Sequence, residues 1–289
     1  MTTYTAITTL STEAAAQALG EAMEELDPTP TGIGVFEIED GSGLWEVGGY
    51  FTERPDVAGL ALLSSMHGAA DFAVSKLDDR DWVAQVQREL TPVVAGPFFV
   101  HGRHDADKVP MNAIGLRIEA AMAFGTGHHG TTLGCLRSLH WLDRQGLRAR
   151  RVADVGCGTG VLAMGAAALW HVPCVATDID QVAVETARAN AEANGLTPFI
   201  RTGLSAGFNA PLLRERAPYD LVFANILAAP LKRLAGDMAA HLAPRGVAIL
   251  SGLLNRQAPG VEAVYRGHGL NVIRRERIGE WTTLVLRRS

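Results

Sequence analysis

The sequence lacks the features that mark secreted and membrane-spanning proteins. It contains three cysteines, Cys135, Cys157 and Cys174, whose spacing forms no pair, so we expect reduced thiols rather than a disulfide framework. Its longest apolar runs, such as VLAMGAAALW at 161–170, are far shorter than the roughly 18 residues that a membrane-spanning helix needs. The first residues carry no basic stretch followed by an apolar one, so no secretory signal is expected. These absences predict a cytoplasmic protein with no membrane partner.

Lysine and arginine are scarce in the first third of the chain. Residues 1–90 contain 16 Asp and Glu but only 4 Lys and Arg, whereas the rest of the chain contains 15 acidic and 22 basic residues. The acidic residues either solvate an exposed surface or form a surface that attracts a basic partner, and composition does not choose between the two. Nucleic acid is disfavoured as a direct partner of this region, because its phosphates would be repelled.

The chain is long enough for two domains, and residues 1–90 predict the first of them. TYTAITTL alternates as a strand does, and Ser11 can cap the helix that follows. Two strands, a short helix and a last strand complete the order β-α-β-β-α-β of the ferredoxin-like unit. A connecting helix is expected over 80–90. Proline and glycine residues then indicate a linker over 91–113 that contains one extended piece, FFVHG.

From about residue 114 the pattern changes to strands that alternate with helices. RVADVG, CVATDI, YDLVFANIL and GVAILSGL are typical of strands, and the segments between them have helical spacing. The third is almost continuously apolar, as expected for a parallel strand covered on both faces. This alternation predicts a doubly wound, Rossmann-like α/β domain over 114–289.

The glycine-rich stretch DVGCGTG follows one of these strands and opens a helix, which is the context of a nucleotide-type binding loop. Gly156, Gly158 and Gly160 allow a tight turn and the close approach of a ligand. Asp178 ends the next strand, where a carboxylate can accept hydrogen bonds from both hydroxyls of a ribose. The spacing G-x-G-x-G and the absence of a phosphate-binding lysine favour an adenosyl ligand without a pyrophosphate, namely S-adenosylmethionine. A dinucleotide remains the alternative, and the role of Asp154 stays open between contacting the ligand's ammonium group and fixing the loop through backbone amides.

Asn225 ends a later strand, where ligands of such sheets bind. Its carbonyl can accept a hydrogen bond from an amine and orient the lone pair of the amine toward a methyl group. Methyltransferases that act on adenine, cytosine or glutamine amide carry Pro-Pro-aromatic after the equivalent residue, whereas Ile226 and Leu227 follow here. An aliphatic amine is therefore a better expected substrate than a planar one. A strand-end asparagine that satisfies the backbone is the structural alternative.

Four motifs occur in one order along the chain, namely AFGTGHHGTT, DVGCGTGVLA, ATDIDQVAVETARANAEANG and ANILAAPLKRLA. Together they resemble the PrmA family, the methyltransferases that modify the stalk-base protein of the large ribosomal subunit, its eleventh protein. The resemblance is strongest over 121–230. It implies a ferredoxin-like recognition domain, a linker and a methyltransferase domain, and it implies methylation of lysine side-chain amines and of an N-terminal α-amine. By motif match, the cofactor contacts fall on Thr132, Gly156, Asp178 and Asn225.

The first of these motifs is expected to form a second wall of the cofactor site. Phe124 could cover the ligand, and Thr126 and Thr132 could donate hydrogen bonds to it. His129 is, in addition to Asn225, a candidate catalytic residue. His129 and Glu119 are the candidates for a general base, although the reaction does not require one. The adjacent histidines do not suggest a metal, and none is expected.

The leading hypothesis is thus a protein amine methyltransferase that acts as a monomer on a basic ribosomal protein and needs no direct contact with nucleic acid. The alternatives are a methyltransferase for a glutamine amide or a nucleic-acid base, and a non-catalytic adenosyl-binding module that docks on a basic partner.

Overall fold

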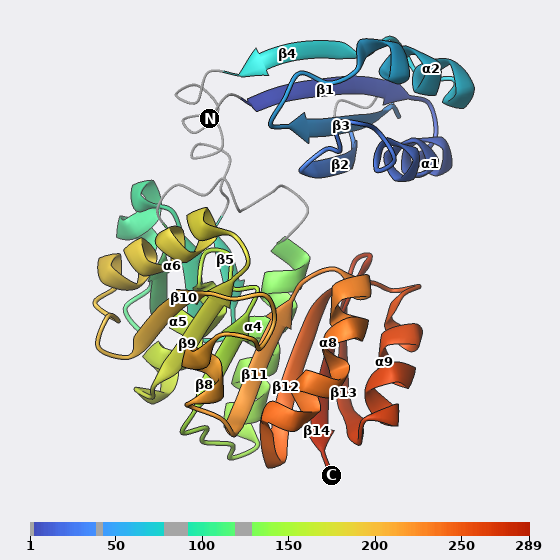
Figure 1. Cartoon of the computed structure of the whole chain (residues 1–289). Helices are drawn as coiled ribbons and strands as arrows, with labels where there is room; N and C mark the ends of the chain where they lie inside the picture. Colours follow the sequence, from blue (N-terminus) through green and yellow to red (C-terminus); the bar gives the residue numbers. More distant parts are fainter. Residues whose placement is uncertain (1–2, 39–42, 78–91, 119–128) are drawn as a thin grey trace. The chain divides into compact units, whose positions relative to one another are not determined.

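The computed structural model describes residues 3–38, 43–77, 92–118 and 129–289 (Figure 1). The chain divides into two compact units, Met1–Arg88 and Glu89–Ser289. The connecting helix expected over 80–90 lies outside the described residues. Among the residues that the structure describes, no helix is long and apolar enough to cross a membrane.

The first unit is a four-stranded antiparallel sheet with two helices. Its elements are β1 (Thr3–Leu10), α1 (Glu13–Met23), β2 (Gly32–Glu37), β3 (Trp45–Phe51), α2 (Val57–His67) and β4 (Ala73–Leu77). The strand order β2-β3-β1-β4 places β3 between β2 and β1, as in the ferredoxin-like arrangement expected from the sequence. Both helices pack on one face of the sheet, with Leu19 and Leu60 in the core that they share with Phe51. The cap of α1 is Thr12 and not the expected Ser11, because the Thr12 hydroxyl accepts the amide of Ala15 at 3.3 Å.

The segment predicted as a linker is folded onto the second unit. It forms the strands β5 (Val93–Ala95) and β6 (Phe98–His101) and the 3-10 helix η1 (Arg103–Lys108), and β6 pairs in parallel with β7 (Ile114–Arg117). The sequence interpretation is wrong here, because alternate apolar side chains of these short strands enter the main core of the second unit. Phe98 is fully buried there and approaches Gly165.

The second unit is built on a seven-stranded sheet of order β10-β9-β8-β11-β12-β14-β13. The first five strands of this order run parallel, and β14 is antiparallel to both of its neighbours. Helices cover both faces over two separate apolar cores, which confirms the predicted doubly wound fold (Figure 1). The elements are α4 (His129–Arg144), β8 (Val152–Val155), α5 (Val161–Trp170), β9 (Cys174–Asp178), α6 (Gln181–Ala193), β10 (Ile200–Leu204), α7 (Pro211–Arg214), β11 (Tyr219–Asn225), α8 (Ala228–His241), β12 (Leu242–Leu254), α9 (Ala258–Gly267), β13 (Leu270–Ile278) and β14 (Trp281–Arg288).

The order of the strands fixes where a ligand can bind. From β8 the chain proceeds to β9 and β10 on one side and then crosses to β11 on the other, so the order reverses between β8 and β11. In sheets of this kind, ligands bind beyond the carboxyl ends of the strands at this reversal. The glycine loop after β8 and Asn225 at the end of β11 both lie at that edge.

Candidate functional site

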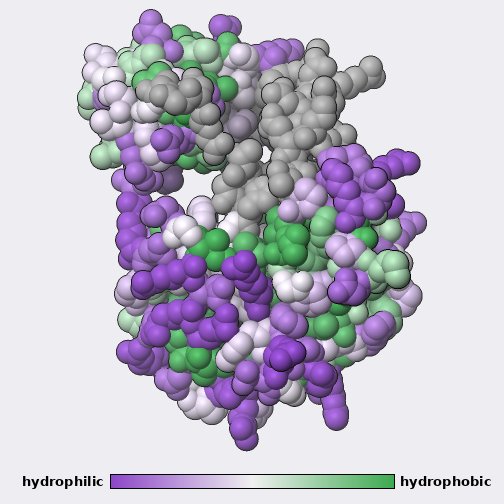
Figure 2. Space-filling model, turned by 180° about the vertical axis from the view of Figure 1, so that it is seen from behind, coloured by the Kyte–Doolittle hydropathy of each residue, from purple (hydrophilic) through white to green (hydrophobic). Residues whose placement is uncertain are grey.

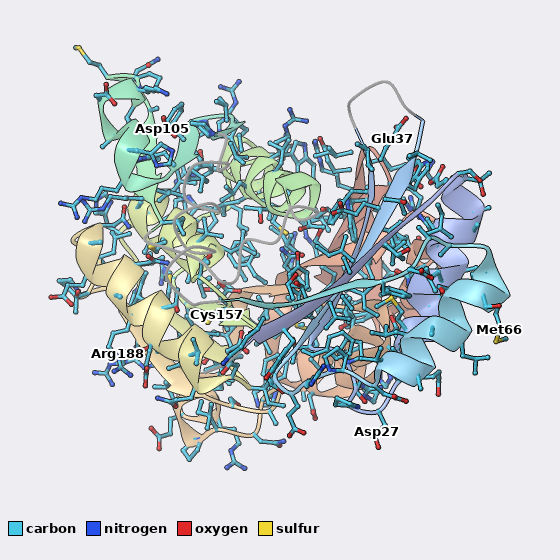
Figure 3. All side chains as sticks on the ribbon, turned by 90° about the horizontal axis from the view of Figure 1, so that it is seen from above. Asp27, Glu37, Met66, Asp105, Cys157 and Arg188 are labelled. Atoms are coloured by element: carbon cyan, nitrogen blue, oxygen red, sulfur yellow. The ribbon has the colours of Figure 1, made fainter. Side chains whose placement is uncertain are left out.

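The glycine loop turns sharply between β8 and α5. Gly156, Gly158 and Gly160 have φ angles of 74°, 51° and 75°, a region that residues with a side chain rarely adopt. The amides of Gly156 and Cys157 both donate to the carbonyl of Thr177, at 2.8 and 2.9 Å, which fixes the loop to the end of β9. The predicted tight turn is therefore present, and Figure 3 shows Cys157 within it.

The three glycines face different surroundings. A Cβ added to Gly156 would lie 2.4 Å from Cγ2 of Ile226, and one added to Gly160 would lie 3.0 Å from Cβ of Ala187. These two positions are required for packing within the protein. A Cβ on Gly158 would meet no described atom within 4 Å. Gly158 is thus the member of the loop that a ligand can approach closely.

Asp178 is held at the carboxyl end of β9 with part of its carboxylate available. Its Oδ2 accepts the amide of Gly158 at 2.9 Å, and its Oδ1 accepts the amide of Asp180 at 3.1 Å. Asp180 in turn caps α6 by accepting the amide of Val182 at 2.9 Å. A carboxylate has about four acceptor positions. Each oxygen of Asp178 therefore keeps capacity for a ligand hydroxyl, which fits the predicted ribose contact.

Two exposed apolar side chains flank Asp178, and the sequence interpretation did not single them out. Ile179 follows it directly, and Leu204 lies opposite it in the register of β10 with β9. Exposed apolar side chains at the edge where the ligand binds suit the face of an adenine ring. The signal in the sequence is an apolar residue just after a strand-end acid, but its exposure becomes visible only in the fold.

Asn225 is oriented by a threonine from the first turn of α4. Its Nδ2 donates to Oγ1 of Thr131 at 3.3 Å, so its Oδ1 is the atom that can accept a hydrogen bond from a substrate amine. Thr131 is fully buried, and its carbonyl accepts the hydroxyl of Ser251 at 3.4 Å. Ser251 also contacts Thr283 through a hydroxyl pair 2.8 Å apart. This buried network holds the asparagine amide in one orientation.

The hydroxyl that reaches Asn225 belongs to Thr131, the neighbour of the predicted contact Thr132, which is itself buried in α4. His129 is the first residue of α4, and the placement of its side chain is not described. Phe124, Thr126 and Glu119 lie in 119–128, outside the described residues. The predicted second wall of the site therefore stays a prediction.

The structure bears on the two roles left open for Asp154. The side chain is buried at the end of β8, and its Oδ2 accepts the amide of Ala163 in the first turn of α5 at 3.0 Å. This bond fixes the start of α5, as in the backbone alternative. Within the described residues, Oδ1 has no hydrogen-bond partner. Burial raises the pKa of Asp154 to about 7; the amide of Ala163 opposes the rise, and the charge of Asp178 adds to it.

Asp154 should make stability depend on pH. Its pKa is higher in the folded chain than the ordinary value of 3.8, so the folded state binds more protons between about pH 4 and pH 7. The free energy of unfolding should therefore fall as pH rises through this window, by at most about 1.4 kcal/mol per pH unit from this group. Asp154→Asn removes the titration and should flatten the curve. Urea unfolding of both proteins at pH 5 and pH 7 measures the free energy of unfolding. An equal change between the two pH values in both proteins would refute the prediction.

Comparison with known proteins identifies the family of the chain. The family profile described as Ribosomal protein L11 methyltransferase (PrmA) matches residues 6–289. A Ribosomal protein L11 methyltransferase of Rhodopseudomonas palustris (strain BisB5) is 44% identical over 282 residues, which cover 96% of this chain and 95% of that protein. The protein of the same name from Bradyrhizobium diazoefficiens is 43% identical over 291 residues, covering 99% of this chain and 98% of that protein.

A solved structure agrees with these matches. The crystal structure of ribosomal protein L11 methylase from Lactobacillus delbrueckii subsp. bulgaricus aligns with a TM-score of 0.60 at 27% identity, covering 69% of this chain and 100% of that one. The fold and the resemblance predicted from the sequence are confirmed. The chain therefore belongs to the PrmA family of ribosomal protein L11 methyltransferases, and its cofactor is S-adenosylmethionine, as the glycine loop and Asp178 predicted.

Proposed function

We propose that this protein transfers methyl groups from S-adenosylmethionine to lysine side-chain amines and to the N-terminal α-amine of ribosomal protein L11. The observation that carries the proposal is the amide of Asn225, which Thr131 orients at the sheet edge beside the glycine loop. An asparagine carbonyl fixed in this way can accept a hydrogen bond from an amine and point the nitrogen lone pair at the methyl group. Positioning of this kind can supply a large part of a rate enhancement.

The residues after Asn225 support an aliphatic amine as the substrate. Ile226 packs over Gly156 and therefore belongs to the wall of the glycine loop, and Leu227 is exposed. Neither supplies the aromatic face on which a planar amine would stack. This arrangement weighs against a glutamine amide or a nucleic-acid base, the alternatives that the sequence left open.

The amine must lose its proton before it can attack. A lysine with a pKa of about 10.4 pays about 4.6 kcal/mol to be neutral at pH 7. The bound cofactor supplies the methyl group and a sulfonium charge, which disfavours an ammonium nearby. The Asn225 carbonyl holds the neutral amine, and exclusion of water favours the same state. His129 is the proposed candidate for taking up the proton, and water could serve instead.

We propose that the cofactor contacts are Phe124, Thr126, Thr132, Gly156, Gly158, Gly160, Asp178 and Asn225. Gly158 and Asp178 have the support of the geometry described above, namely the open space at one and the remaining acceptor positions of the other. We further propose that the first unit recognises a basic surface of L11, and that the enzyme acts as a monomer in the cytoplasm without direct contact to nucleic acid. The acidic composition of residues 1–90 supports the basic partner.

Mass spectrometry of the product tests the proposal. The purified full-length chain is incubated with S-adenosylmethionine and purified L11. The intact product should gain mass in increments of one methyl group, and peptide mapping should place these on lysines and on the N-terminus. Transfer to other atoms of L11 would contradict the proposed specificity, and the absence of any transfer would contradict the proposed activity.

Gly158→Ala should weaken cofactor binding without preventing folding. The added Cβ would enter space that no described protein atom occupies, and a ligand close to the backbone would meet it. We expect the affinity for S-adenosylmethionine to fall about tenfold or more, a loss of roughly 1.4 kcal/mol.

Gly195→Ala is the matched control for this variant. Gly195 has a φ of 67° and equally open space around its Cβ position, but it ends α6, at the opposite edge of the sheet from the site. In both variants an alanine must adopt a positive φ, which destabilises the fold by a similar amount, about 1–2 kcal/mol. Calorimetric titration with the cofactor compares the two, and equal affinities would remove Gly158 from the cofactor site.

A further inference from the structure

The outer face of α2 carries no charged side chain. The six residues on this side are exposed, whereas Leu60 and Ser64 on the opposite side are buried, Leu60 in the core formed with the sheet and α1. The exposed residues recur at helical spacing and are apolar or small: Val57, Ala58, Ala61, Leu62, Ser65 and Met66. A helix side that faces water is normally rich in charged residues. The face formed by these six residues is called the α2 face below.

Its large side chains extend into solvent. Val57, Leu62 and Met66 are 51%, 61% and 69% exposed. Figure 3 shows Met66 on the outer side of α2, pointing away from the sheet. The surface of the first unit that Figure 2 displays mixes hydrophobic and hydrophilic side chains. Contiguous apolar surface with a polar rim is typical of a site that binds another protein.

The rim of the α2 face is acidic. Gly59 in the first turn of α2 has close neighbours, because an added Cβ would lie 3.1 Å from Cδ2 of Leu26 and 3.0 Å from Oδ2 of Asp56. The turn after α1 therefore packs against the start of α2. That turn carries exposed carboxylates at Glu24, Glu25 and Asp27, and Asp56 adds another as the cap of α2.

We propose that the α2 face is the docking site for a basic, amphipathic segment of the ribosomal protein substrate. Apolar side chains of the segment would cover Leu62 and Met66, and its lysine or arginine side chains would lie against the carboxylates of the rim. The charge of the rim selects this occupant, since a second copy would bring a like-charged rim against it. The inference rests on the proposed function, and it names the surface through which the first unit holds L11.

The test uses the full-length chain and one pair of matched substitutions. Met66→Lys places a positive charge on the α2 face, where it opposes both the apolar contact and the basic partner. Met111→Lys makes the same change at a fully exposed position of the second unit. We expect Met66→Lys to raise the KM for L11 and the dissociation constant of L11 about tenfold or more, with cofactor affinity and melting temperature unchanged. Met111→Lys should change none of these.

The rim is tested separately by salt. Glu24→Gln combined with Glu25→Gln should weaken L11 binding at low ionic strength, and the difference from the unmodified chain should shrink as salt is added. An identical salt response of the two proteins would remove the rim from the docking site.

The remaining outcomes separate this inference from the proposed function. Titration of L11 without cofactor measures docking whether or not methyl transfer occurs, so an inactive enzyme that binds L11 through Met66 overturns only the proposed function. An active enzyme with equal KM values for Met66→Lys and Met111→Lys overturns only the docking site. A dimer in sedimentation that Met66→Lys dissociates would assign the α2 face to a second copy and would also overturn the inference.

Discussion

Asn225→Ala is expected to lower kcat for methylation of L11 by about 100-fold or more, while the loss of one cofactor contact lowers the affinity for S-adenosylmethionine by no more than about tenfold. Asn225 lies at the end of β11, where Thr131 orients its amide, and it is the group that we propose to hold the amine. Without its carbonyl, the amine is neither held nor aligned with the methyl group. The truncation leaves the glycine loop and Asp178 in place, so the cofactor should still bind. Single-turnover transfer of labelled methyl groups and calorimetric titration measure the two quantities separately.

Two further variants make this result interpretable. Asn271→Ala applies the same truncation to an exposed asparagine of β13 that bonds to Ser289, and it should leave kcat unchanged. Thr131→Val keeps the shape of the threonine and removes the hydroxyl that holds Nδ2 of Asn225, so we expect an intermediate loss of kcat. Adding Thr131→Val to Asn225→Ala should then cost little more, because both act on one interaction. Unchanged turnover of Asn225→Ala would remove Asn225 from the amine site.

The parts of the site that the sequence predicts are those that follow from local patterns. The loop DVGCGTG is predicted because its glycines stand between a strand and a helix. Asp178 and Asn225 are predicted because they are polar residues at the ends of apolar strands. The topology of a parallel sheet then brings such strand ends to one edge. For these residues the sequence contains the information, because both the element and its end are encoded nearby.

Other features depend on contacts between distant segments. Thr131 does not stand out in the sequence, since only the rotation of α4 against β11 brings its hydroxyl to Asn225. The segment 91–113 was interpreted as a linker from its proline and glycine residues, but its apolar side chains alternate over strands too short to stand out. The partner of Asp154 Oδ2, the amide of Ala163, follows the loop closely in sequence, yet this bond depends on how α5 begins and no local pattern predicts it.

Deletion of residues 1–90 is expected to abolish methylation of L11 and to spare cofactor binding. The second unit keeps both of its cores in the shortened chain, because the first apolar residue of these cores is Val93, where β5 begins. The glycine loop and Asp178 belong to this unit, so the affinity for S-adenosylmethionine should stay within about threefold of that of the full-length chain.

The loss arises from recognition. The core of the first unit consists of its own residues, and the unit brings the acidic surface and the α2 face with it. Without them, L11 would have to reach the amine site by unassisted collision, and its effective concentration there would fall steeply. The same transfer assay measures both proteins, with Asn225→Ala in the full-length chain as a control that keeps the first unit and is expected to lose turnover through the amine site alone. A shortened chain that methylates L11 as fast as the full-length one would refute the recognition role and the α2 docking site together. A shortened chain that no longer binds the cofactor would show instead that the first unit supports the fold of the second.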